Sequence, residues 1–287
     1  MSRTLLARPD VSLLCHDDGA GSSVVVLLHG LAGSAGELAP TAASLVGRHR
    51  VIAFDQRGHG HSTRRPADVS REAYVADVIA VLDALVGADA AEVTLVGQSM
   101  GAHTALLTAA WHPDRVQRLV LLEGGVGGDA DSDYPHRLGQ WFASWPVPFP
   151  DERAAVDFLG STKTAKAWAR DLERRPDGLW PRFDADIMTA AIGAVAARAR
   201  WAEWGRIRAG TTLVRGSLGS VPDDQVARML EMRPEVDHIV IPDAGHDVHL
   251  DRPAVWFATL AGVWGTPTQG IYGRHHVTHT PDEEEQR

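Results

Sequence analysis

The chain has 287 residues, of which 44% are hydrophobic and 23% charged, the composition of a globular protein able to bury a sizeable core. Its formal net charge of −9 argues against a nucleic-acid partner, because phosphate binding needs a basic surface, and its single cysteine, Cys15, excludes an internal disulfide framework. No apolar run approaches the ~18 residues of a membrane span, and the N-terminal segment is too charged for a signal peptide, so we expect a cytoplasmic protein without a membrane partner.

Six short apolar runs rich in β-branched residues predict strands. In chain order they span residues 24–30, 50–58, 92–99, 118–125, 211–217 and 238–246. Apolar residues at helical spacing predict helices over residues 74–86 and 101–111. Continuous apolar runs are typical of strands buried on both faces, and their alternation with helices indicates a parallel sheet. We therefore expect an α/β fold with a mostly parallel, doubly wound sheet flanked by helices.

The regular alternation stops between residues 126 and 205. That segment is rich in tryptophan, proline and arginine, contains helix-like pieces and lacks clear strands. We interpret residues 126–205 as a helical cap inserted into a core formed by residues 1–125 and 206–270. The last segment, residues 271–287, is predicted to be a polar C-terminal tail.

The stretch LVGQSMGAHTALL, residues 95–107, places Ser99 between Gly97 and Gly101, where a predicted strand meets a predicted helix. A sharp strand-to-helix turn forces its central residue into a strained backbone conformation, and the two glycines remove side chains that would collide there. This G-x-S-x-G pattern is typical of a nucleophile elbow, which presents the serine hydroxyl at the tip of the turn. The alternative is that Ser99 only caps the helix.

Four segments, LLHGLAG, FDQRGHGHS, VGQSMGAHTA and PDAGHDVHLDRP, follow one another in an order that resembles the α/β-hydrolase superfamily, in particular its capped, esterase-like and lactonase-like members with a serine nucleophile. The resemblance covers nearly the whole chain and implies the α/β-hydrolase fold. It implies that Ser99 is the nucleophile and that the backbone N–H groups of Leu31 and Met100 form the oxyanion hole. It also implies that His246 is the base, and the chemistry agrees, because a serine hydroxyl needs a neighbouring imidazole to take its proton.

The acid of the triad departs from the commonest pattern of this superfamily, because no aspartate follows the predicted strand 211–217 closely. Glu123 ends the strand after the nucleophile strand, where some members of the superfamily carry their acid. A carboxylate buried there without a partner would be costly, and a bond with His246 would satisfy both groups. Two alternatives stay open: Glu123 braces the cap hinge through backbone N–H groups, or the acid is Asp223 or Asp224.

The remaining histidines are given simpler interpretations. His275, His276 and His279 resemble a metal cluster by composition, but they lie in the polar tail without a carboxylate framework. His103 is expected to pack on its helix, and nothing assigns a task to His249. We therefore expect no metal and no cofactor.

Six of the nine tryptophans lie in the predicted cap. In the family that the sequence resembles, such an insertion usually covers the nucleophile, excludes water and shapes the substrate pocket. We expect four of the rings to line this pocket: Trp141, Trp145, Trp168 and Trp204. The alternative is that most of the rings only hold the cap to the sheet domain.

These residues predict a serine hydrolase that cleaves an ester, lactone or thioester of a small, apolar or aromatic substrate by acyl transfer to Ser99 and then to water. Hydrolysis of carbon–carbon bonds and perhydrolase chemistry use the same groups and stay open, as does a ligand-binding homologue with little turnover. The expected partner is a small-molecule substrate, and a homodimer is compatible with the sequence.

Overall fold

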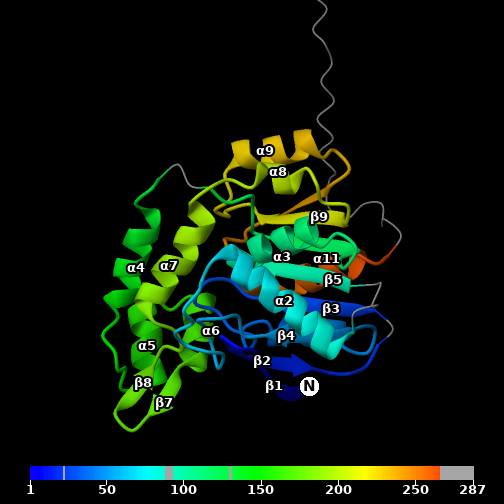
Figure 1. The fold of residues 1–287 in the computed structure, drawn as a ribbon. Coiled ribbons are helices and arrows are strands. Elements are labelled where there is room, and N and C mark those ends of the chain that lie inside the picture. The colour runs from blue at the N-terminus through cyan, green and yellow to red at the C-terminus, as the bar shows by residue number, and fades with distance from the viewer. Residues whose placement is uncertain (22, 88–92, 129–130, 266–287) are drawn as a thin grey trace, which may run out of the picture.

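The computed structural model describes residues 1–21, 23–87, 93–128 and 131–265, so the predicted tail 271–287 lies outside the described residues. Its centre is an eight-stranded sheet in the order β1-β2-β4-β3-β5-β6-β9-β10 (Figure 1). The strands are β1 (Ser2–Ala7), β2 (Ser12–Asp17), β3 (Val24–Leu28), β4 (Arg50–Phe54), β5 (Val93–Gln98), β6 (Arg118–Leu122), β9 (Gly210–Gly216) and β10 (Asp237–Ile241). Six of them pair in parallel, which confirms the α/β class and the mostly parallel sheet.

The six predicted strands are all present, because a run that is apolar at every position is the pattern of a strand buried on both faces. Strands β3 and β5 are buried along their whole length. The sequence does not predict the antiparallel hairpin β1–β2 at the edge of the sheet. Five of the six residues of β1 are exposed, so this strand lacks the apolar run from which the others are recognised.

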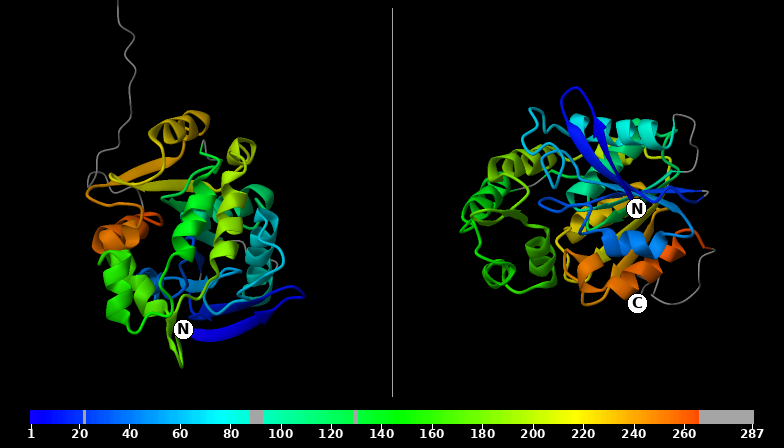
Figure 2. Two further views of the ribbon diagram at one scale, coloured as in Figure 1. Left: turned by 90° about the vertical axis from the view of Figure 1, so that its left-hand side faces the viewer. Right: turned by 90° about the horizontal axis from the view of Figure 1, so that it is seen from below.

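Helices cover both faces of the sheet, and alternate side chains of β3 point into two separate apolar cores. One core includes α2 (Arg71–Leu85), α3 (Met100–Trp111) and α9 (Asp223–Met232). The other includes α1 (Ala39–Leu45) and α11 (Pro253–Gly262). Both layers are visible in the two views of Figure 2. Removal of these apolar side chains from water holds the strands in place and thereby positions the loops at their carboxyl ends.

The segment between β6 and β9, which we predict to be a cap and call the cap below, lies beside the sheet (Figure 1). Its elements are α4 (Tyr134–Ala143), α5 (Glu152–Leu159), α6 (Lys163–Asp171), β7 (Glu173–Arg175), β8 (Gly178–Trp180) and α7 (Ala185–Ala196). The cap is mostly helical, but β7 and β8 pair as an antiparallel hairpin, which corrects the expectation of a segment without strands. Each of these strands has three residues, too few to produce a periodic pattern.

The last helix of the predicted cap, α8 (Trp201–Trp204), belongs to the sheet domain by its packing. It lies against α3, and Trp204 is completely buried in the core that α3 and α9 share. The indole N–H of Trp204 donates to the backbone carbonyl of Met229 at 2.9 Å. Trp204 therefore packs with the sheet and its helices, although it lies within the segment 126–205 predicted to be the cap.

Polar contacts hold the cap to the sheet domain on two sides. On one side, Arg64 donates to the carboxylate of Asp184 at 2.7 and 2.9 Å and to two backbone carbonyls just before it. On the other side, the hydroxyl of Thr164 on α6 donates to Asp247 at 2.6 Å. Asp247 directly follows His246, so this second attachment lies beside the predicted base.

Candidate active site

Ser99 occupies the turn between β5 and α3 with φ 52° and ψ −118°, a backbone conformation that residues with a side chain rarely adopt. The flanking glycines make this turn possible. A Cβ atom on Gly97 would collide with the backbone of Gly101, and one on Gly101 would collide with the carbonyl oxygens of Leu28 and His29. The strained serine between close-packed backbones is the geometry expected of a nucleophile elbow.

The hydroxyl group of Ser99 does not cap the helix. Ser99 stands at the N-cap position of α3, but its side chain makes no capping hydrogen bond. The interpretation of Ser99 as a structural cap therefore lacks the contact that defines it. The first N–H groups of α3 and the helix dipole favour negative charge at this same end of the helix.

The loop after β3 comes close to Ser99. A Cβ atom on Gly30 would lie 3.4 Å from the Cβ of Ser99, and Leu31 follows directly. Among the loop and turn hydrogen bonds of the described residues, none has the backbone N–H of Leu31 or of Met100 as donor. Both N–H groups therefore remain open to an acceptor, as an oxyanion hole requires.

Hydrogen bonds of two buried side chains, His29 and Asp55, hold the loop after β3 in place. The backbone N–H of Gln56 donates to His29 Nε2 at 2.9 Å, so the proton of this imidazole is on Nδ1, which donates to the carbonyl of Gly30 at 2.7 Å. The buried carboxylate of Asp55 accepts the backbone N–H groups of Ala35 and His61, each at 2.8 Å. These contacts give the segments around His29 and Asp55 a structural task.

His246 lies in the loop after β10 and faces Glu123, the residue that follows β6. The Nδ1 atom of His246 is 3.3 Å from Oε2 of Glu123. The Glu123 side chain is fully buried, and its two carboxylate oxygens accept the backbone N–H groups of Gly216 and Ser220, each at 2.8 Å. The carboxylate thus contacts the predicted base, and its two backbone donors lie at the end of β9 and in the loop after it rather than at the cap hinge.

The charges of this pair support each other. Burial raises the pKa of Glu123, but the hydrogen bonds from His246 and from the two backbone N–H groups outweigh it, so the pKa lies below its ordinary value. Burial lowers the pKa of His246, but the bond with Glu123 and the nearby charge of Asp247 outweigh it, so this pKa is raised. An ionised Glu123 favours the tautomer with a proton on Nδ1, which leaves Nε2 free to accept a proton.

Ser220 is a contact of His246 to which the sequence assigns no role. Its Oγ atom lies 2.8 Å from Nδ1, closer than the carboxylate of Glu123. It stands in the loop after β9, where the commonest pattern of the superfamily would place an aspartate. The neighbouring Gly219 is also required, because a Cβ atom there would collide with the carboxyl group of Glu123. The absence of an aspartate from this loop does not by itself indicate which side chain takes its place beside the histidine.

The two alternative acids point elsewhere. The side chain of Asp223 is 93% exposed and pairs with Arg215 at 2.8 Å. The carboxylate of Asp224 accepts the backbone N–H of Gln225 in the first turn of α9 at 2.9 Å. Of the three predicted acids, Glu123 is therefore the one that contacts His246.

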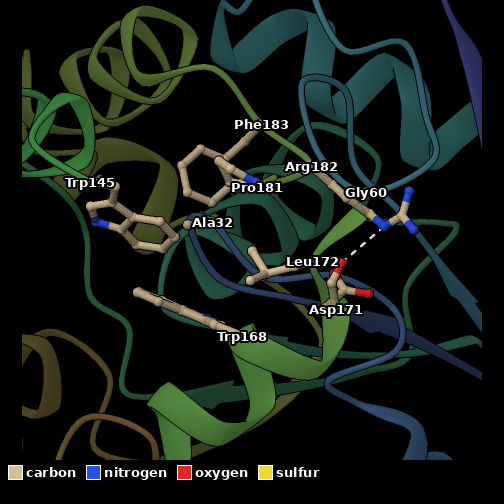
Figure 3. A pocket seen from close by; sticks show the side chains of 10 residues that line it. Ala32, Gly60, Trp145, Trp168, Asp171, Leu172, Pro181, Arg182 and Phe183 are labelled. Carbon is tan, nitrogen blue, oxygen red and sulfur yellow. Dashed lines mark hydrogen bonds between the residues drawn. The ribbon is translucent and has the colours of Figure 1, made fainter. Parts of the chain in front are cut away.

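A cavity separates the loop after β3 from the cap (Figure 3). Ala32 and Gly33 of the loop contribute to its lining, and the cap contributes Trp145, Trp168 and Phe183. In Figure 3 the two indole rings lie on the same side of the cavity, opposite Asp171 and Arg182. Two of the four tryptophans predicted for the substrate pocket thus line a cavity next to the predicted oxyanion loop.

The other two tryptophans of that prediction lie outside the cavity lining. Trp141 is partly exposed and packs edge-on against Trp145, with 5.4 Å between the ring centroids. Trp204 is the last residue of α8, and its side chain is buried in the core that α3 and α9 share, so its assignment to the pocket is corrected. Its aromatic surface is used in packing, as the alternative interpretation of the tryptophans allows.

A chain of polar contacts links the cap to the loop that carries His246. The indole N–H of Trp168 donates to Glu37 at 3.1 Å, and Glu37 pairs with Nε2 of His249 at 3.0 Å. The side chains of Glu37 and His249 are almost completely buried. His249 therefore has a role that its position in the sequence does not reveal. Through Glu37, it links the short helix α10 (Val248–Asp251) to Trp168 of the cap.

Two further features concern only the described part of the chain. It contains no group of three or more histidine, cysteine or acidic side chains that could hold a metal ion. Its helices are too short or too polar to cross a membrane. His275, His276 and His279 lie outside the described residues.

A family model described as "Alpha/beta hydrolase family" matches residues 25–260. The chain belongs to this family. It is similar to the mouse sn-1-specific diacylglycerol lipase ABHD11, with 28% identity over 83% of this chain and 79% of that protein. It is also similar to the Escherichia coli esterase YbfF, with 26% identity over 81% of this chain and 89% of that protein.

Solved structures share the fold of this α/β hydrolase. The crystal structure of E-2-(acetamidomethylene)succinate hydrolase superimposes with a TM-score of 0.81 over 91% of this chain and 98% of that one, at 20% identity. At this identity the likeness shows the fold alone. The family model and the two named relatives, a lipase and an esterase, show that the chain is a hydrolase.

Proposed function

We propose that this α/β hydrolase cleaves a carboxylic ester, lactone or thioester through an acyl-enzyme on Ser99. The observation that carries the proposal is the strained, uncapped serine in a turn after β5, in a fold that also brings His246 against a buried, ionised Glu123. The names of the relatives, a lipase and an esterase, support ester hydrolysis.

The proposed reaction has two halves, formation of the acyl-enzyme and its hydrolysis, and the same groups act in both. His246 Nε2 takes the proton of Ser99 as Oγ bonds to the substrate carbonyl carbon, and the carbonyl electron pair moves onto oxygen. The N–H groups of Leu31 and Met100 stabilise this oxyanion. When the tetrahedral intermediate collapses, the leaving group departs with the proton from His246. Water then attacks the acyl-enzyme with the same help from His246, and Ser99 regains its proton.

Glu123 and Ser220 hold the imidazole for both half-cycles. As His246 becomes an imidazolium, its Nδ1–H faces an ionised carboxylate and a hydroxyl oxygen, and both interactions strengthen. We place a small apolar or aromatic part of the substrate against Trp145 and Trp168, because indole rings exclude water and favour flat groups. The cavity there has a volume of about 10 Å³, room for about one water molecule, so the cap has to move outward to admit such a group.

Hydrolysis of 4-nitrophenyl acetate and 4-nitrophenyl butyrate tests the proposal. Ser99→Ala should lower kcat by roughly 10³-fold or more and leave the melting temperature nearly unchanged. The matched control is Ser217→Ala, because this exposed serine on the loop after β9 contacts the backbone of Asp243 and not His246. More than a tenth of the wild-type rate in Ser99→Ala would overturn the proposal. No turnover of either ester by the wild-type protein would favour the ligand-binding alternative.

A further inference from the structure

A buried arginine without an acid partner lies behind the nucleophile elbow. Arg71 is the first residue of α2 and is 1% exposed. One nitrogen of its guanidinium group donates to the backbone carbonyl of Met100, at 3.4 Å, and to the hydroxyl of Thr104, and the group lies 4.5 Å from the ring centre of Tyr74. In the described part of the chain, Arg71 forms no ion pair, and its Nε and Nη1 atoms are buried without a hydrogen-bond partner.

The surroundings do not neutralise this charge. The neighbouring Arg200 is itself a cation and takes the nearby acids, Glu203 at 3.1 Å and Glu72 at 3.7 Å. Glu72 has a largely exposed side chain, so water screens its effect on Arg71. His103, on the first turns of α3, is neutral, because burial and then the charges of Arg71 and Arg200 hold its pKa well below the ordinary value.

Arg57, another buried arginine of this protein, forms ion pairs with two acidic residues. The Arg57 side chain is equally buried, but its guanidinium group contacts Asp77 at 2.6 Å and Asp10 at 3.1 Å. An unpaired charge in the interior is strongly destabilising, and a partner or a function is expected wherever one is kept. Arg71 lacks the partner in the resting protein, so the structure points to a charge that is balanced only at another stage.

The contact with Met100 indicates at which step of the proposed reaction the charge is balanced. The guanidinium group of Arg71 holds the carbonyl of Met100, whose own backbone N–H is one of the two proposed oxyanion donors. We propose that Arg71 is a positioning residue that fixes the first turn of α3 and whose unneutralised charge favours the oxyanion formed beside Ser99. The inference rests on the proposed function. The positive charge adds to the dipole of α3 in a region from which water is excluded, where fixed charges act most strongly.

The test compares Arg71→Met, which removes the charge and keeps an unbranched stem of similar shape, with the wild-type protein on 4-nitrophenyl butyrate. We expect kcat to fall about 10- to 30-fold, which is about 1.4–2 kcal/mol of activation free energy, with KM within about threefold of the wild-type value. Arg233→Met is the matched control, because Arg233 is also buried, lies over the ring of Trp204 and contacts no residue of the candidate site. It should lower the melting temperature without changing kcat.

Arg71→Lys keeps the test decisive if Arg71→Met does not fold. A buried lysine without an acid partner has a pKa below its ordinary value of about 10.4, so kcat of this variant should decrease at alkaline pH as the amine loses its charge. Burial lowers the pKa of Arg71 to about 10, so the wild-type protein should keep its kcat to a higher pH than the lysine variant does. A kcat within twofold of wild type in Arg71→Met, or identical alkaline profiles of Arg71→Lys and wild type, would overturn the role of Arg71. Full loss of activity in Ser99→Ala alongside either result would leave the proposed function intact.

Discussion

Replacement of Glu123 by glutamine tests the acid of the proposed triad with little change in shape. Glutamine can still accept one backbone N–H through its amide oxygen, but the amide has no negative charge. Its NH₂ group would also face either a backbone donor or Nδ1 of His246, and the second arrangement forces the proton of the imidazole onto Nε2. A histidine with its proton on Nε2 cannot take the proton of Ser99.

The size of the effect follows from the 3.3 Å separation of Nδ1 and the carboxylate oxygen. At an effective dielectric constant of about 20, a full pair of charges at that distance gains about 5 kcal/mol. The amide dipole and Ser220 recover part of this energy. We therefore expect a loss of roughly 10²–10⁴ in kcat, which corresponds to about 2.7–5.5 kcal/mol of the barrier, with little change in KM.

The assay is the initial rate of 4-nitrophenyl butyrate hydrolysis at saturating substrate, with the circular dichroism spectrum as a check of folding. Asp223→Asn and Asp224→Asn are the controls, because both carboxylates point away from His246, and they should stay within a few-fold of wild type. A Glu123→Gln variant that keeps more than a tenth of the wild-type kcat would refute the reasoning. Loss of activity in an Asp223 or Asp224 variant alone would move the acid to that position.

Three further results are expected. The acid limb of kcat/KM should have its midpoint above the ordinary histidine pKa of about 6.5, because the base must be neutral and its pKa is raised; a midpoint below 6 would contradict this. Gly219→Ala should lower kcat at least tenfold in a folded protein, because the new Cβ atom displaces the carboxyl group of Glu123; unchanged kinetics would show that the carboxylate is not needed there. Trp204→Ala should lower the free energy of unfolding in urea by about 3–5 kcal/mol, whereas Trp168→Ala should mainly change the ranking of acyl chain lengths; the reverse pattern would return Trp204 to the pocket.

Several parts of the site can be predicted from the sequence because they depend on local chemistry. The elbow around Ser99 needs glycine at two positions, and no other residue type fits the close backbone contacts there. Glu123 could be inferred because a carboxylate at the end of an apolar strand must find a partner. The buried strands were recognisable because both of their faces are apolar.

Other parts depend on contacts between distant segments and have no local pattern. Ser220 is one of several small residues in its loop, and only the fold brings its hydroxyl to Nδ1 of His246. Trp204 and Trp168 are alike in sequence, since an aromatic ring suits both a core and a pocket. Arg71 in the first turn of a helix is typical of a solvated side chain, and its burial is visible only once α2 packs on α3.

The central claim is that Ser99 is the nucleophile that carries the acyl group. A fluorophosphonate probe reacts with activated serine hydroxyls and stays bound, so mass spectrometry of the labelled protein after proteolysis tests the claim directly. We predict one adduct per chain, on the peptide that contains Ser99, with labelling slowed in His246→Ala and abolished in Ser99→Ala. Labelling at another residue, or no labelling of a folded wild-type protein, would contradict the account.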